Sequence, residues 1–436
     1  MSFVLFYIQD GRCSAALPLT PFPSPSYSPD VTPDTRATTV LPAAARLRGF
    51  SYAIRNIVSA AAAIEKTGRR VRYLNIGDPV QYGFDTPPHL VEAVVRALRD
   101  GRNGYVSSAG IPEARQAIAN DYTRRGVRLT PERVFVTAGT SEGIDLALSA
   151  IVDPGDDVLV PVPTYPLYTA VLAKLGARPN YYRLDPSAAW QPDLDDLRAR
   201  ITDRTRALVV IDPNNPTGAI YPERLRRDLL ELADRRGLVL IADEVYGDLA
   251  FDGPVPPIAS LDDRAPVLSV GSLSKGYLAP GWRTGWVAVA DTDRLADVLA
   301  AIQRLADGRV CSPGPPQSAI AAALTGDRSH QDRFRSALRE RAELTSSRLN
   351  AIPGISCVPP KAAFYAMPRA ALPPGLTDER FVLDLLAETG ILVVYGSGFG
   401  MPASAGYFRV VFLPSLEELS GVYADLARFA AGVLTG

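Results

Sequence analysis

Several short segments of this 436-residue chain place polar side chains directly after apolar, β-branched runs. Lys275 follows "VLSV", and Asp243 and Tyr246 follow "LVLIA". Asn215 follows "LVVI" in the segment "DPNNPTG". A lysine can attack a carbonyl carbon and move a proton, and a carboxylate can hold a positive charge beside it. These residue types together predict a site for amine and carbonyl chemistry.

A further polar segment, "AGTSEG", follows the run "VFVT" and begins a helical pattern. It contains Gly139, Thr140 and Ser141. A helix N-terminus with free backbone N–H groups favours an anion, and phosphate suits it well. Ser272 and Arg283 flank the lysine, and an arginine can bind phosphate through two hydrogen bonds. We therefore expect an anion site close to Lys275.

The elements that must position these side chains are five short apolar runs. Each run is too short for a typical helix and is typical of a strand buried on both faces. The runs are residues 133–139, 157–163, 207–213, 238–244 and 267–272. Residues 87–101 and 222–237 begin with proline and end with glycine, as helices often do. The alternation predicts a mostly parallel sheet, with the polar side chains meeting beyond its carboxyl edge.

The remaining pattern predicts how the chain is divided. Residues 1–40 are rich in proline and serine, which predicts a disordered N-terminal extension. After about residue 320 a long helical pattern around residues 332–351 is followed by shorter strands, which predicts a smaller α+β domain.

Composition excludes several classes of function. A formal net charge of -1 gives no basic surplus for binding nucleic acid. The three cysteines are far apart and form neither a metal spacing nor a disulfide framework. No segment is apolar for long enough to cross a membrane. We therefore expect a cytoplasmic protein with no metal site and no nucleic-acid or membrane partner.

Taken singly, these motifs match many loops, but their joint appearance at strand ends is informative. The segments "DPNNPTG", "DEVY", "SLSKGYLAPGWRTGW" and "YFRVVF" resemble the signature blocks of the class I aminotransferases. The resemblance implies fold type I, the cofactor pyridoxal 5'-phosphate (PLP), and a mostly parallel seven-stranded sheet in the large domain. It also implies an N-terminal arm and part of the small domain at 41–80, the large PLP-binding domain at 81–320 and the C-terminal small domain at 321–436.

The resemblance also assigns roles to matched residues. Lys275 resembles the lysine that binds the cofactor covalently and moves the substrate proton. Asp243 resembles the carboxylate beside the ring nitrogen, and Tyr246 a catalytic tyrosine that binds the ring hydroxyl oxygen. Arg409 resembles the arginine that binds the substrate α-carboxylate, and Gly77 a backbone contact to the same group.

Further matched residues complete the implied cofactor site. Asn215 resembles a residue that binds the ring hydroxyl and contacts substrate, and Tyr165 the aromatic that stacks on the ring. The other implied cofactor contacts are Gly139, Thr140, Ser141, Ser272, Ser274 and Arg283. Tyr105 resembles a tyrosine that reaches the phosphate in the partner subunit, which implies a homodimer with shared active sites.

The N-terminal segment that begins "GFSYAIR" resembles the arm of the bacterial glutamate–pyruvate (alanine) aminotransferases. The implied reaction converts L-alanine and 2-oxoglutarate to pyruvate and L-glutamate. Tyr52 and Arg55 match positions near the substrate. The hypothesis is that Arg55 approaches the distal carboxylate of glutamate and swings away for alanine, while Tyr52 closes the smaller pocket. The alternative is that both residues only tie down the arm.

Other functions stay open on these motifs. An aspartate or aromatic aminotransferase, a PLP-dependent carbon–sulfur lyase and a cyclopropane-forming synthase share the cofactor blocks. "SLSK" also fits the Ser-x-x-Lys of serine acyl-enzymes, but "KTG" at Lys66 precedes it here and "SDN" is absent. A non-catalytic PLP regulator would need a DNA-binding domain ahead of this region, and the N-terminal tail is too short for one.

Overall fold

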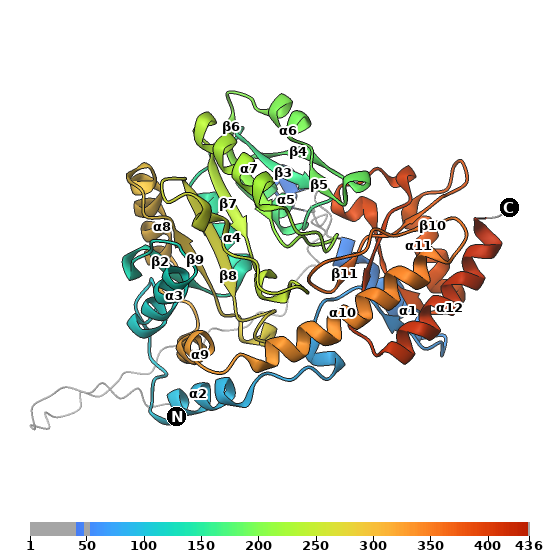
Figure 1. Ribbon diagram of the computed structural model, residues 1–436, viewed down its shortest axis with the longest axis horizontal. Helices are drawn as coiled ribbons and strands as arrows, with labels where there is room; N and C mark the ends of the chain where they lie inside the picture. The colour runs from blue at the N-terminus through green and yellow to red at the C-terminus, as the bar shows by residue number, and fades with distance from the viewer. Residues whose placement is uncertain (1–40, 48–52, 435–436) are drawn as a thin grey trace, which may run out of the picture. The chain divides into compact units, whose positions relative to one another are not determined.

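The computed structural model describes residues 41–47 and 53–434, with side chains in the second range from Ile57 onward. Residues Ala44–Gly436 form one compact unit around an eight-stranded sheet of order β2-β9-β8-β7-β6-β3-β4-β5 (Figure 1). The strands are β2 (Val134–Thr137), β3 (Asp157–Val162), β4 (Arg178–Asp185), β5 (Gln191–Pro192), β6 (Thr205–Ile211), β7 (Val239–Asp243), β8 (Val267–Ser272) and β9 (Gly285–Val289). Strands β8, β7, β6, β3 and β4 pair in parallel, whereas β9 and β5 run antiparallel to their neighbours.

The predicted mostly parallel sheet is confirmed. The five apolar runs are β2, β3, β6, β7 and β8, and every residue of β2 and β8 is buried. The sheet has eight strands rather than seven because the two-residue β5 pairs with the end of β4. Such a short edge strand has too few residues to leave an apolar alternation in the sequence.

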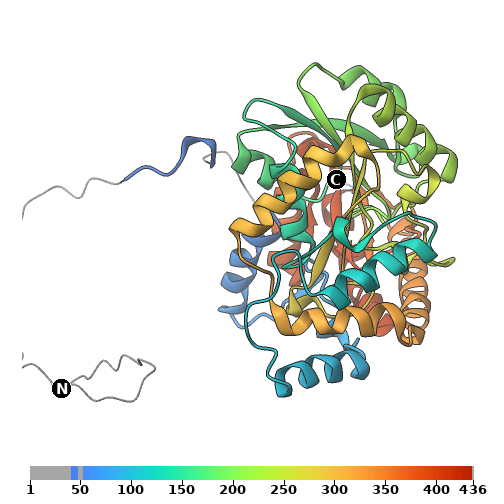
Figure 2. The same ribbon diagram turned by 90° about the vertical axis from the view of Figure 1, so that its left-hand side faces the viewer.

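Helices cover this sheet and link its strands. They are α2 (Pro88–Arg99), α3 (Pro112–Arg124), α4 (Thr140–Ser149), α5 (Leu167–Leu175), α6 (Leu194–Arg200), α7 (Glu223–Arg236), α8 (Ala296–Gly308) and α9 (Gly314–Thr325). Helix α4 packs against β8 and β9, α3 against β2, and α7 against β7. Helices α2 and α9 lie side by side although they are far apart in sequence (Figures 1 and 2). In the described ranges, no helix has the length and apolar character needed to cross a membrane.

The C-terminal region packs against the N-terminal segment. It contains α10 (Ser329–Asn350), α11 (Asp378–Thr389), α12 (Leu416–Val433) and the short strands β10 (Ile355–Ser356), β11 (Tyr365–Ala366), β12 (Arg369–Ala370), β13 (Ile391–Leu392), β14 (Val394–Tyr395) and β15 (Phe408–Val411). Strand β1 (Arg72–Tyr73) pairs in parallel with β13, and α1 (Ala53–Glu65) packs on α11 (Figure 1). The domain boundaries at residues 80 and 320 stay predictions.

Helix α7 is fastened to the sheet by a buried ion pair. Arg226 Nε lies 3.2 Å from Asp212 Oδ2, and the two side chains are 5% and 4% exposed. Burial raises the pKa of Asp212 to about 7, and the guanidinium opposes that rise. Asp212 directly follows β6, so the ion pair holds the loop that carries Asn215.

Arg226→Ala should therefore lower the free energy of unfolding by about 3 kcal/mol, because it leaves a buried carboxylate unpaired. Equilibrium urea denaturation at fixed protein concentration measures this loss. Arg227→Ala is the matched control on the same helix, since Arg227 pairs with Glu223 on the surface. That change should cost less than about 1 kcal/mol. Equal losses in the two variants would contradict the role of the buried pair.

Candidate active site

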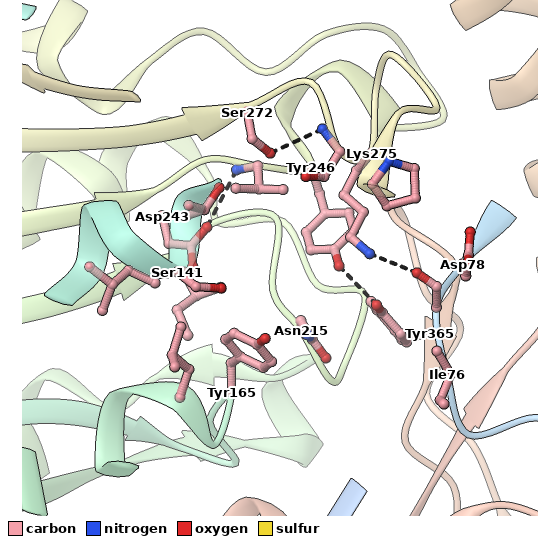
Figure 3. A pocket seen from close by; sticks show the side chains of 18 of the residues that line it. Ile76, Asp78, Ser141, Tyr165, Asn215, Asp243, Tyr246, Ser272, Lys275 and Tyr365 are labelled. Carbon is pink, nitrogen blue, oxygen red and sulfur yellow. Dashed lines mark hydrogen bonds between the residues drawn. The ribbon is translucent and has the colours of Figure 1, made fainter. Parts of the chain in front are cut away.

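A cavity of about 490 Å³ lies beyond the carboxyl ends of β6, β7 and β8 (Figure 3). The N-terminal segment, the starts of α4 and α5, the loop that carries Arg283, and strands β11 and β15 supply the rest of its lining. The cavity brings together these predicted site residues: Gly77, Thr140, Ser141, Tyr165, Asn215, Asp243, Tyr246, Ser272, Ser274, Lys275, Arg283 and Arg409.

Lys275 is on the loop that follows β8, and its amine is enclosed. Its Nζ donates a hydrogen bond of 2.6 Å to the backbone oxygen of Gly77. Burial lowers the pKa of Lys275 to about 8. The Asp78 carboxylate raises this pKa, whereas the Arg409 and Arg283 guanidinium groups lower it. The neutral, nucleophilic fraction of this amine near neutral pH is therefore larger than that of an ordinary lysine.

Asp243 is the last residue of β7 and is 6% exposed. Burial raises the pKa of Asp243 to about 6, while hydrogen bonds from the Tyr168 hydroxyl and the Val245 backbone lower it. The Tyr168 hydroxyl lies 3.1 Å from Asp243 Oδ2. A cation in the cavity would favour the charged carboxylate.

Tyr168 was not among the predicted site residues. It lies on α5, three residues after Tyr165, and it is fully buried. Residues three apart can share one face of a helical turn, so the spacing in "TYPLY" is the signal that could have identified it.

Arg409 lies on β15 and is 2% exposed. Its Nη1 donates to Asn215 Oδ1 at 3.1 Å, and its Nη2 donates to the backbone oxygen of Asn75. The guanidinium lies over the rings of Tyr365 and Phe399, 4.7 and 4.8 Å from their centroids. An arginine held this way in a cavity wall suits a carboxylate, which it can bind through two hydrogen bonds.

The opposite wall of the cavity is formed at the N-terminus of α4. Gly139 precedes the helix with a φ of 82°, a conformation that favours glycine. A side chain at Gly139 would overlap the guanidinium of Arg283, which donates to the backbone oxygen of Ala138 at 3.2 Å. Helix N–H groups, hydroxyls and a guanidinium together favour an anion.

Tyr246 and Tyr365 meet at the inner wall of the cavity, where their hydroxyl oxygens are 2.8 Å apart (Figure 3). Burial raises the pKa of Tyr246 well above its ordinary value. Tyr365, which lines the cavity, was also not among the predicted site residues. It lies on β11, and no local pattern around it indicates a contact with the loop after β7.

The remaining predicted residues lie elsewhere. Tyr105 is 90% exposed and lines a separate cavity of about 180 Å³. Tyr52 lies outside the described residues, and Arg55 is placed only by its backbone in α1. Within residues 41–47 and 53–434, no cluster of three or more His, Cys, Asp or Glu side chains could hold a metal ion.

Known proteins match nearly the whole chain. A family model described as aminotransferase class I and II matches residues 71–421. Alanine aminotransferase of Mycobacterium tuberculosis is 38% identical over 88% of this chain and 91% of its own length. Glutamate-pyruvate aminotransferase AlaA of Escherichia coli is 36% identical over 89% of this chain and 97% of its own length. The solved alanine aminotransferase of Pyrococcus furiosus superposes with a TM-score of 0.87 at 41% identity, covering 90% of this chain and all of that one.

Proposed function

Because the chain belongs to the class I and II aminotransferases, we propose that it uses PLP to convert L-alanine and 2-oxoglutarate to pyruvate and L-glutamate. The observation that carries the chemistry is the enclosed amine of Lys275 in one cavity with the Asp243 carboxylate. The choice of alanine rests on the names of the similar proteins and on the N-terminal segment. An aspartate or aromatic aminotransferase, or a carbon–sulfur lyase, is the alternative.

The residues that line the cavity fit PLP. The N-terminus of α4 with Arg283 would hold the phosphate. The Arg283 guanidinium lies so close to Gly139 that no side chain fits there. Asp243 would pair with the ring nitrogen, and Tyr165 would stack on the ring. Tyr246 and Asn215 would hydrogen-bond the ring hydroxyl oxygen. Ser272 and Ser274, which line the same wall, would add phosphate contacts.

PLP, when bound, supplies an electron sink for charge that develops at the substrate Cα. The residues of the chain then have separate tasks. Arg409 holds the substrate α-carboxylate and thereby orients the Cα–H bond. Lys275 Nζ would take the proton from Cα and deliver it to the carbon of PLP that receives the amino group, which a neutral amine of lowered pKa can do near neutral pH. Asp243, which lines the cavity, would stabilise a positive charge on the ring nitrogen.

A second copy of this chain is part of the proposal. Tyr105 is almost fully exposed, and its cavity is lined by Arg102 and Ser318 as well as by the half-buried Val106 and Ile111. A large aromatic side chain that is left almost fully exposed is typical of a protein interface. We infer a homodimer in which Tyr105 reaches the phosphate site of the partner subunit. The proposed location is the cytoplasm.

The proposal is tested first at the lysine. Borohydride reduction of the PLP-loaded enzyme should attach the cofactor to Lys275, which peptide mass analysis detects. Lys275→Ala should still bind PLP but lose nearly all turnover, because it removes the amine that lines the cavity. Attachment to Lys66, Lys174 or Lys361 would contradict the assignment. L-alanine should bleach the visible absorbance and 2-oxoglutarate should restore it, whereas a lyase would release pyruvate and ammonia without a 2-oxo acid.

A second test concerns substrate choice. We propose that Arg55 meets the distal carboxylate of glutamate and moves away for alanine, while Tyr52 closes the smaller pocket. Arg55→Ala should slow the glutamate half-reaction by an amount equivalent to about 2–5 kcal/mol and leave the alanine half-reaction nearly unchanged. Single-turnover bleaching with each amino acid measures this difference.

Arg409→Ala is the matched control, since it removes the α-carboxylate contact that both substrates need. It should slow both half-reactions. Equal losses for glutamate and alanine in Arg55→Ala would rule out the switch and favour the alternative that Arg55 only ties down the N-terminal arm.

A further inference from the structure

Tyr365 touches three parts of the proposed site at once. It is 3% exposed and lines the cavity from β11. Its hydroxyl oxygen is 2.8 Å from that of Tyr246, and its ring lies under the Arg409 guanidinium. A Cβ built on Gly77 would overlap its hydroxyl, so this hydroxyl lies directly against the backbone that accepts the hydrogen bond of Lys275.

The hydrogen bond between the two phenols can run in either direction. Each phenol carries one proton, so Tyr246 can donate to the ring hydroxyl of PLP only if it accepts a hydrogen bond from Tyr365. The positive charge over the Tyr365 ring favours this direction, because it draws electron density away from the Tyr365 O–H bond.

We propose that Tyr365 is a positioning residue that donates its proton to the Tyr246 hydroxyl and thereby directs the Tyr246 proton into the cavity. This inference rests on the proposed function, since it assumes that Tyr246 faces PLP. A hydrogen bond received by Tyr246 strengthens the one that it donates. Tyr365 therefore tunes the electronic state of the cofactor site without touching the reacting atoms.

The contacts of Tyr365 also explain why it stays in place. Its ring packs at a tilt on Phe364, with centroids 4.8 Å apart, and edge-on to Tyr246 at 5.6 Å. With the ring held on these sides and the hydroxyl against Gly77, little rotation is open to the side chain. A phenylalanine at position 365 would keep this packing and lose only the donor.

The test is a pH titration of the visible absorbance of the PLP-loaded enzyme, with a double-mutant cycle. Hydrogen bonds to the ring hydroxyl oxygen lower the midpoint of this titration. Tyr365→Phe should raise the midpoint by roughly half a pH unit. Tyr246→Phe should raise it further, and the double variant should match Tyr246→Phe alone because no hydroxyl remains to be directed.

The kinetic result should separate positioning from binding. Tyr365→Phe should lower kcat and leave the KM for L-alanine nearly unchanged, since its ring still supports Arg409. Tyr365→His, which restores a donor on a ring, should recover part of the midpoint shift. It also serves as the second variant if Tyr365→Phe does not fold.

Tyr423→Phe is the matched control. The Tyr423 side chain is 2% exposed, and its hydroxyl lies 2.8 Å from Thr345 Oγ1, away from the residues that line the cavity. It should leave the midpoint unchanged. An unchanged midpoint in Tyr365→Phe would overturn the inference. So would a double variant whose midpoint exceeds that of Tyr246→Phe by as much as Tyr365→Phe exceeds the wild type. If the wild-type enzyme shows no absorbance that L-alanine bleaches, the proposed function fails instead.

Discussion

The enclosed amine of Lys275 is the constraint on which the rest of the site depends. An amine in this cavity loses hydration, and its charged form is disfavoured by burial and by Arg409 and Arg283. Its hydrogen bond to the Gly77 oxygen holds it between the sheet and the N-terminal segment. Several distant elements must therefore meet: the loop after β8, the segment after β1, and strand β15. The parallel sheet supplies the rigid edge on which they meet.

Local sequence was sufficient for the large sheet and for the groups at its edge. Asp243 ends β7, and Lys275 and Asn215 lie three and four residues beyond the ends of β8 and β6, so the strand ends also determine where these side chains lie. Parallel strands bring their carboxyl ends together, which explains why four separate motifs form one cavity.

Contacts between segments far apart in the chain could not be predicted from local sequence. Tyr365 meets Tyr246 across 119 residues of sequence, and that contact requires β11 to reach the loop after β7. Tyr168 was missed for a different reason. Its hydroxyl donates a hydrogen bond to Asp243 Oδ2, but Tyr168 itself does not line the cavity. The two-residue β5 left no apolar pattern because only an edge contact with β4 defines it.

The most direct measurement of the central constraint is the pH dependence of chemical labelling of Lys275 in the enzyme freed of PLP. Only the neutral amine reacts with an acylating reagent, so the labelled fraction of Lys275 at each pH, measured by peptide mass analysis, reports its pKa. The exposed Lys66 serves as an internal reference for the reactivity of the reagent at each pH. The account predicts a labelling midpoint for Lys275 near pH 8, because burial lowers its pKa to about 8. A midpoint near the ordinary lysine value of about 10.4 would contradict it.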